Sequence, residues 1–226
     1  GVMIEQGSLV ALTTSEVNAV GMRADDSILH ACSMTFDPSV YLVWSPLLCG
    51  ARLVLGRKDA YVDPEYLRWL LVEHEISFTE WVPSVLALYM KSVSDAFPIC
   101  FRRIYAGGEA FTPTLAEEML RTYPHVSPWN SYGPTEVTVT SHGFECGTDG
   151  VGRPNFSPHA VPIGKTYTNT TSFILDASLR AVPPAVREGV EAALRPVCDL
   201  CRGRARAGYR DRRRCAAHGR AGGEEQ

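Results

Sequence analysis

The sequence predicts an α/β fold built on a largely parallel sheet. Short apolar and β-branched runs alternate along the chain with amphipathic segments of helical spacing, which is the order of elements in strand–helix–strand units. Hydrophobic residues make up 45% of the 226 residues, which is ample for a core. We expect helices to flank the sheet, and ligands to bind beyond the carboxyl ends of its strands.

The predicted strands are short runs that end at turn-forming residues. Residues 27–33 end at Phe36-Asp37-Pro38-Ser39, and residues 104–106 run directly into Gly107-Gly108-Glu109. Similar runs predict strands at 53–55, 76–82, 137–140 and 172–176, while residues 2–13 fit either a strand or a short helix.

The predicted helices lie between these strands. Apolar residues at helical spacing predict helices at 40–48, 64–73, 84–92 and 114–123. The clearest start belongs to the helix at 64–73, because Asp63 can cap it and Pro64 suits its first position.

Composition excludes several classes of protein. A net charge of -3 argues against a nucleic-acid binder, and no stretch is long and apolar enough to span a membrane or to act as a secretion signal. The seven cysteines do not form the pattern of a disulfide scaffold, so we expect a reducing, cytoplasmic setting. Because the first residue is glycine, we expect the chain to begin inside a longer protein.

The most informative stretch is Asn130-Ser131-Tyr132-Gly133-Pro134-Thr135-Glu136. It lies between β-prone runs and contains turn formers, so we expect a loop at a strand end. A small hydroxyl beside a carboxylate suits a site that holds a phosphate oxygen and its magnesium ion. The tyrosine ring offers a flat face for a base.

This heptad resembles the Asn-x-Tyr-Gly-Pro-Thr-Glu motif of adenylate-forming enzymes, above all the adenylation domains of non-ribosomal peptide synthetases. The resemblance implies that Tyr132 stacks on adenine, and that Asn130 or Ser131 forms a hydrogen bond near it. It also implies two catalytic residues, Thr135 at the α-phosphate and Glu136 at the magnesium ion.

Gly107-Gly108-Glu109 alone is consistent with a plain strand-to-helix turn. The same resemblance implies that this turn lines the adenine pocket with its backbone, and adjacent glycines let a main chain come close to a flat base.

Asp37 falls where the family has its Phe-Asp-x-Ser motif, whose aspartate pairs with the α-ammonium group of an amino-acid substrate. A low dielectric strengthens such a pair. By itself, an aspartate before proline is also a common helix start. Relatives that activate fatty or aryl acids generally lack this aspartate, so the resemblance implies an amino-acid substrate.

The resemblance further implies a pocket for the substrate side chain. Its positions fall on Asp37, Pro38, Tyr41, Glu80, Ile104, Ala106, Ser131, Val139 and Thr140. If Glu80 lines this pocket, a buried carboxylate favours a polar or cationic side chain; the alternative is that Glu80 points to water.

The resemblance covers residues 1–184, which would form the central part of the large N-terminal subdomain of an adenylate-forming enzyme. The family's phosphate-binding loop, its Gly-Glu-Leu strand, its ribose-binding aspartate and its small domain with a catalytic lysine fall outside this stretch. We therefore expect the chain alone to be a poor catalyst. The implied cofactors are ATP and Mg²⁺, together with phosphopantetheine on a carrier domain, and the implied partners are the carrier and condensation domains of a parent synthetase.

Residues 185–226 are rich in Arg, Ala and Gly, and we expect this tail to be disordered or out of frame. A rival reading is a zinc site, because Cys198-x-x-Cys201 is followed by Cys215-x-x-His218. Three functions thus stay open: amino-acid adenylation, an acyl-CoA ligase of the same superfamily, or a non-catalytic remnant with a zinc-binding tail.

Overall fold

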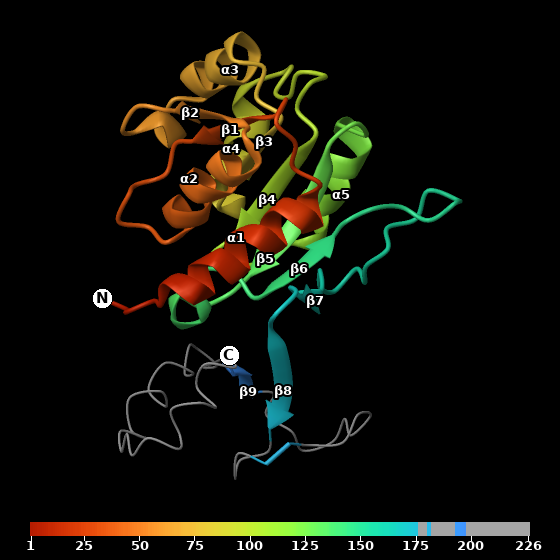
Figure 1. Ribbon diagram of the computed structural model, residues 1–226. Coiled ribbons are helices and arrows are strands. Elements are labelled where there is room, and N and C mark those ends of the chain that lie inside the picture. Colours follow the sequence, from red (N-terminus) through yellow and green to blue (C-terminus); the bar gives the residue numbers. More distant parts are fainter. Residues whose placement is uncertain (176–179, 182–192, 198–226) are drawn as a thin grey trace. The chain divides into compact units, whose positions relative to one another are not determined.

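The computed structural model describes residues 1–175, 180–181 and 193–197, and the chain divides into two units, Gly1–Thr168 and Asn169–Gln226 (Figure 1). In the second unit, the described part is an antiparallel pair of strands, β8 (Thr171–Leu175) and β9 (Ala193–Val197). The expected boundary near residue 184 lies outside the described residues and stays a prediction.

The first unit is built on one sheet, whose strands lie in the order β2-β1-β3-β4-β5-β6-β7. The strands are β1 (Ser27–His30), β2 (Arg52–Leu55), β3 (Phe78–Trp81), β4 (Arg103–Gly107), β5 (Ser127–Tyr132), β6 (His142–Glu145) and β7 (Lys165–Thr166). Neighbours from β2 to β5 pair in parallel, whereas β6 and β7 are antiparallel additions at one edge. The predicted α/β class with a mostly parallel sheet is confirmed.

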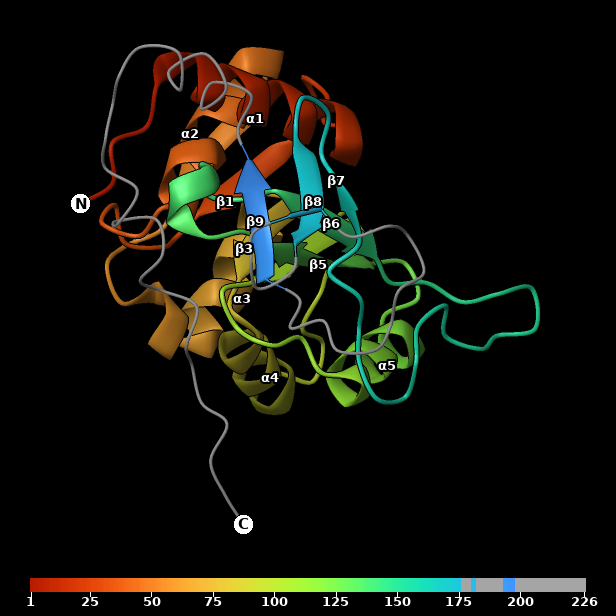
Figure 2. The ribbon, with the colours of Figure 1, turned by 90° about the horizontal axis from the view of Figure 1, so that it is seen from below.

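Helices cover both faces of this sheet. They are α1 (Gln6–Val20), α2 (Pro38–Cys49), α3 (Pro64–Glu73), α4 (Pro83–Ser92) and α5 (Pro113–Thr122), with single 3₁₀ turns η1 (Ala60–Val62) and η2 (Thr135–Val137). Figure 2 shows α1 and α2 on one side of the strands and α4 and α5 on the other. The core is accordingly in two parts, one packed under α1 and α2 and a larger one under α3, α4 and α5.

Local sequence explains where these helices start. The α3 helix begins as predicted, with Pro64 in its first turn and the Asp63 carboxylate accepting a hydrogen bond from the Tyr66 amide at 3.0 Å. Thr112 caps α5 in the same way, by accepting from the Leu115 amide. Within the described residues, no helix is both long and apolar enough to cross a membrane.

Three expectations about local structure need correction or refinement. Of residues 2–13, the helical alternative holds from Gln6 onward, within a longer helix, α1, which is capped by Gly21 in the left-handed conformation with φ 60°. The heptad begins inside β5 instead of lying wholly in a loop. The strand predicted at 137–140 is wrong, because Thr138 and Val139 have positive φ values, 70° and 66°. The chain reverses here to bring β6 antiparallel to β5, and this tertiary demand overrides β-branched propensity.

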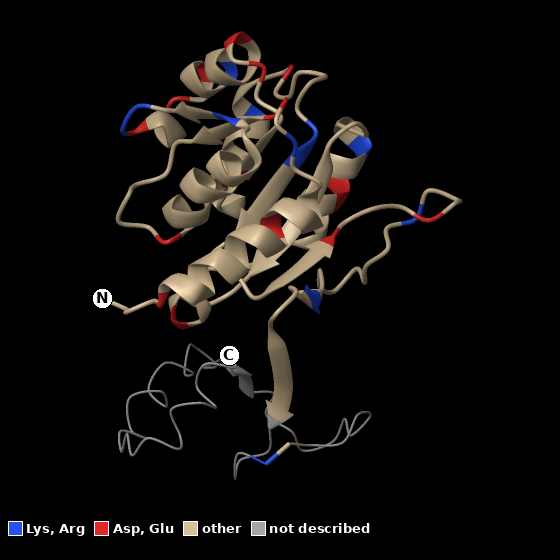
Figure 3. Ribbon diagram, in the orientation of Figure 1, with Lys and Arg blue, Asp and Glu red and all other residues tan. Residues whose placement is uncertain are grey.

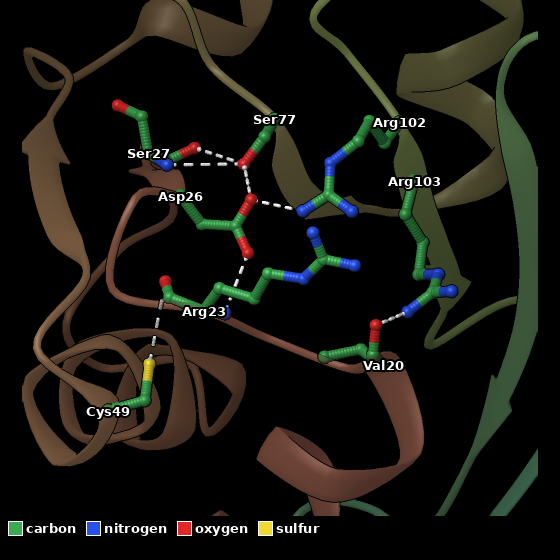
Figure 4. Close-up of polar contacts among 8 residues, drawn as sticks. All are labelled: Val20, Arg23, Asp26, Ser27, Cys49, Ser77, Arg102 and Arg103. Atoms are coloured by element: carbon green, nitrogen blue, oxygen red, sulfur yellow. Dashed lines mark hydrogen bonds and ion pairs between the residues drawn. The ribbon is translucent and has the colours of Figure 1, made fainter.

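A polar cluster ties three strands together at their amino ends (Figure 4). Asp26, which precedes β1, accepts hydrogen bonds from Ser77 Oγ at 2.8 Å and from the Arg23 amide at 2.8 Å, and it forms an ion pair with Arg102. Ser77 precedes β3 and Arg102 precedes β4. Burial alone would raise the pKa of Asp26, but the bonds from Arg102, the Arg23 amide and Ser77 outweigh it, so this pKa lies below its ordinary value.

We expect Asp26→Ala to lower the free energy of unfolding by about 2 kcal/mol, because it leaves the buried Ser77 hydroxyl and the Arg23 amide without this acceptor and removes the ion pair with Arg102. Urea unfolding followed by circular dichroism measures the change. The neighbouring Asp25 is exposed, so Asp25→Ala is the matched control, with a change within about 0.5 kcal/mol. Equal effects of the two substitutions would contradict the importance of the cluster.

Candidate active site

A cavity of about 350 Å³ lies at the carboxyl ends of β1, β3 and β4. Its walls come from the β1–α2 loop, from η1, and from the ends of β3 and β4. The lining residues are Cys32, Ser33, Thr35, Phe36, Pro38, Tyr61, Glu80, Trp81, Val82 and Gly107. Since parallel strands place their carboxyl ends at one edge, distant parts of the sequence meet here as expected for a ligand site.

Asp37 stands between two lining residues and contacts the heptad. Its Oδ2 accepts a hydrogen bond from Thr135 Oγ1 at 2.6 Å, across 98 positions of sequence. Although Asp37 directly precedes α2, its side chain makes no capping hydrogen bond to that helix. The carboxylate therefore faces the site instead of capping the helix.

Gly107 is a point of close approach. A Cβ atom at this position would lie 2.5 Å from Glu80 Oε1 and 3.1 Å from the Ser131 carbonyl oxygen, so no larger residue fits without movement. Gly108 has a positive φ of 81° and faces Val82 and Phe36, so the glycine pair turns the chain against the cavity wall.

Glu80 points into the protein, so the alternative that it faces water is wrong. The residue is 7% exposed and lines the cavity, and its Oε2 atom has no hydrogen-bond partner. Burial raises the pKa of Glu80 well above its ordinary value, and the negative charges of Glu16 and Asp37 raise it further. These three carboxyl groups therefore influence one another electrostatically.

The strand register separates the predicted pocket residues into two groups. Glu80 pairs with Tyr105, and Gly107 pairs with Ser131, which places these four on the face covered by α1 and α2. Ile104 and Ala106 alternate with them and pack in the core on the opposite face. The structure thus does not bring Ile104 and Ala106 to the Glu80 face, and Tyr105 and Gly107 take their place there.

Two further predicted pocket residues are buried on the Glu80 face. Tyr41 and Val139 pack in the same core cluster as Tyr105. The Tyr41 hydroxyl and Thr140 Oγ1 are buried without a hydrogen-bond partner, whereas the Tyr105 hydroxyl lies next to Glu16 and Tyr167. Such orphaned polar atoms are rare in protein cores and call for an explanation.

Sequence reasoning missed a buried acid, Glu16, on α1. It is the one charged residue of α1, and the acidic position is coloured red on that helix in Figure 3. A lone acid in an otherwise uncharged helix was the signal that could have marked it as a site residue. Glu16 is 1% exposed. Burial raises its pKa to about 7, although the Tyr105 and Tyr167 hydroxyls and the Arg103 charge lower it. Neither carboxylate oxygen completes a hydrogen bond of ordinary geometry.

The predicted nucleotide-binding residues have varied surroundings. Tyr132 is 36% exposed and its ring makes an edge contact with His142. The Asn130 amide donates to the Pro162 carbonyl at 2.8 Å, which joins β5 to the segment before β7. The Glu109 carboxylate accepts from the amide and hydroxyl of Ser84, both at 3.0 Å, at the start of α4. Asn130 and Glu109 therefore hold the frame of the site with their side chains, and their proposed contacts with nucleotide stay predictions.

The cavity holds no activated nucleophile. Burial and the nearby Glu80 raise the pKa of the Cys32 thiol to about 11, so it stays protonated at neutral pH. Within the described residues, no three His, Cys, Asp or Glu side chains gather into a metal-binding group. The cysteines and histidine of the zinc alternative, Cys198, Cys201, Cys215 and His218, lie outside the described residues.

The fold and the site together define an α/β domain with a cavity at the carboxyl ends of its parallel strands. A family model described as AMP-binding enzyme matches residues 1–190, and the chain belongs to this family of adenylate-forming enzymes. Phosphinothricin tripeptide synthetase PhsB of Streptomyces viridochromogenes is 36% identical over 171 residues, which are 74% of this chain and 14% of that protein. Indigoidine synthase of Dickeya dadantii is 32% identical over 182 residues, 80% of this chain and 12% of that protein.

Solved structures agree with this assignment. The nonribosomal peptide synthetase FmoA3 matches with a TM-score of 0.71 at 24% identity, over 81% of this chain and 19% of that chain, which supports the fold. The four-domain nonribosomal peptide synthetase AB3403, bound to AMP and glycine, matches with a TM-score of 0.69 at 25% identity, over 81% of this chain and 13% of that chain. The predicted family is confirmed, and the chain spans only a small part of the length of these relatives.

We expect Gly107→Ala to destabilise the protein by about 2 kcal/mol, because the added methyl group meets the Glu80 carboxylate and the Ser131 backbone. Urea unfolding measures the loss. Gly150 has nothing within 4 Å of a built Cβ, so Gly150→Ala is the control and should change stability little. A tolerated Gly107→Ala would show that the three strands do not pack as closely as described.

The buried Glu16 should make stability depend on pH. Its pKa rises from 4.5 to about 7 on folding, so its contribution to stability is full below pH 4.5 and is lost as the pH rises through 7. Relative to the unaltered protein, the free energy of unfolding of the Glu16→Gln variant should therefore rise by about 3 kcal/mol between pH 4.5 and 7.5. Unfolding curves at several pH values measure this gain. Glu73→Gln, at an exposed position, should show none, and a pH-independent difference for Glu16→Gln would contradict the assignment.

Proposed function

We propose that the chain supplies the AMP- and amino-acid-binding part of an enzyme that converts an amino acid and ATP into an aminoacyl adenylate and pyrophosphate. The observation that carries the proposal is the contact between Asp37 and Thr135. It places a carboxylate, which suits an α-ammonium group, beside the hydroxyl of a motif that resembles an α-phosphate-binding loop. Family membership and the structural relative bound to AMP and glycine support the same reaction.

In this reaction a carboxylate oxygen of the amino acid attacks the α-phosphorus of ATP. A bond forms between that oxygen and phosphorus, and the bond to the β-phosphate bridging oxygen breaks, so that pyrophosphate leaves with the electron pair. Asp37 would fix the α-ammonium group, and the Thr135 hydroxyl would exchange its hydrogen bond to Asp37 for one to an α-phosphate oxygen. The exposed face of Tyr132 would stack on adenine beside the Gly107–Gly108 turn. Positioning and charge neutralisation supply most of the catalysis in such transfers.

Glu136 is the residue that would hold Mg²⁺. It is exposed at the start of η2, next to Thr135, and the described residues offer no larger acidic group. A single carboxylate fits Mg²⁺, which usually takes one or two carboxylates and completes its shell with phosphate oxygens and water. The ion would neutralise charge on the phosphates.

The acceptor of the acyl group would be the phosphopantetheine thiol of a carrier domain, with a condensation domain as the next partner. The curated relatives support this proposal because they are far longer than this chain, which spans 12–14% of PhsB and indigoidine synthase. The cytoplasmic location expected from cysteine usage stays a prediction, and the described cysteines are free thiols.

Amino-acid-dependent exchange of pyrophosphate into ATP tests the proposal, in the protein that carries this chain with its natural flanking sequence. We expect Asp37→Ala to lower the exchange activity about 100-fold, since a desolvated charge pair is lost. Asp37→Asn keeps an oxygen for Thr135 while removing the charge, and it should lose activity as well.

Asp95 is exposed, so Asp95→Ala serves as the control with unchanged exchange. Activation of aryl or fatty acids that is insensitive to Asp37→Ala would instead establish an acyl-CoA ligase and overturn the amino-acid proposal.

A further inference from the structure

The cavity has acidic side chains in and beside its wall, but no basic side chain among its lining residues. Glu80 lies in its wall and Asp37 lies at its edge, and both charges act on the same space. Within the described residues, the three salt bridges involve Arg57, Arg102 and Arg153, and none of them reaches Glu80. A buried carboxylate with neither a cation nor a complete set of hydrogen bonds is costly unless a ligand supplies them.

A second buried acid, Glu16 on α1, acts on Glu80. Glu16 is close enough for its charge to act on Glu80, and the Tyr105 and Tyr167 hydroxyls lie beside it. The nearest cation, Arg103, is committed elsewhere: its guanidinium donates to the Val20 carbonyl and lies over the Trp129 ring, 5.3 Å from its centroid. The negative charge of Glu16 is therefore only partly balanced.

The face that carries Glu80 is polar in a further respect. The Tyr41 hydroxyl, Thr140 Oγ1 and Glu80 Oε2 are all buried without hydrogen-bond partners. Glu80 is the one of these residues that lines the cavity, so a ligand with a polar end would satisfy Glu80 Oε2, whereas an aliphatic ligand would leave it unsatisfied.

We propose that the site selects an α-amino acid whose side chain ends in an ammonium or guanidinium group, held by the Glu80 carboxylate while Asp37 holds the α-ammonium group. The proposal rests on the function proposed above and names its substrate class. Glu16 acts on Glu80 as a positioning residue, because it lies against the Tyr105 hydroxyl, and Tyr105 is the register partner of Glu80 on the same face.

A cation fits better than a neutral amide side chain. An amide could donate to one oxygen of Glu80, but it brings no positive charge to stabilise the ionised form of Glu80 against burial and the nearby Glu16 and Asp37 charges. Two positive groups on one substrate would pair with Asp37 and with the ionised form of Glu80. In a low-dielectric pocket this pairing is worth far more than it would be in water.

The test is pyrophosphate exchange in the protein with its natural flanking sequence, using substrates matched in length. L-Lysine, L-ornithine and L-arginine are compared with L-norleucine and L-glutamine. We expect kcat/KM for the best cationic substrate to exceed that for L-norleucine at least about 100-fold. Glu80→Gln keeps the shape but removes the charge, and it should reduce this preference to within about tenfold. Glu73→Gln is the control and should preserve it.

Glu16→Gln separates the positioning role from a structural one. We expect the preference for L-lysine over L-norleucine to fall about fivefold, while the protein becomes more stable at neutral pH. A purely structural Glu16 would leave the preference unchanged.

The outcomes distinguish this inference from the proposed function. Exchange that is faster with L-norleucine or L-glutamine than with every cationic substrate overturns the cationic specificity and leaves amino-acid adenylation standing. Exchange with no amino acid in the unaltered protein overturns the proposed function itself. If Glu80→Gln fails to fold, as judged by circular dichroism, the substrate comparison in the unaltered protein still decides.

Discussion

The structure depends above all on the parallel register of β3, β4 and β5. That register sets Gly107 between Glu80 and the Ser131 carbonyl, with room for no side chain at the middle position. It also decides which side chains share a face, because neighbours in register point the same way. The cavity, the inward direction of Glu80 and the place of Tyr105 all follow from this close approach of three strands.

The two ends of the sheet use buried acids in opposite ways. At the amino ends, Asp26 is fully engaged by an arginine, a serine and a backbone amide, and its pKa lies below the ordinary value. At the carboxyl ends, Glu80 is buried without such partners and its pKa is raised. A buried acid whose hydrogen bonds and charge are matched stabilises the fold. A buried acid without such partners costs stability and is typical of a functional site, where a ligand supplies the missing partners. This contrast locates the functional edge independently of any motif.

Sequence patterns predicted much of the fold and part of the site. Helical spacing and capping predicted α3 to its first residue, and the heptad indicated the family that the comparisons then confirmed. They failed where tertiary structure overrides local preference. The β-branched run at 137–140 became a turn, because the chain must reverse between two antiparallel strands. Glu16 was invisible as a site residue, because nothing in an apolar helix shows which neighbours its one acid will meet.

By itself the sequence determined the order of strands and helices, the nucleotide-type heptad and the acid that follows the first strand. These are encoded in runs of neighbouring residues, where propensity, capping and spacing act. Only the tertiary structure decided that Thr135 bonds to Asp37, that Glu80 faces inward beside Glu16, and that Tyr105 instead of Ile104 shares its face. Such facts depend on strand register and on packing between segments far apart in the chain, and a shift of one residue reverses the face of every side chain.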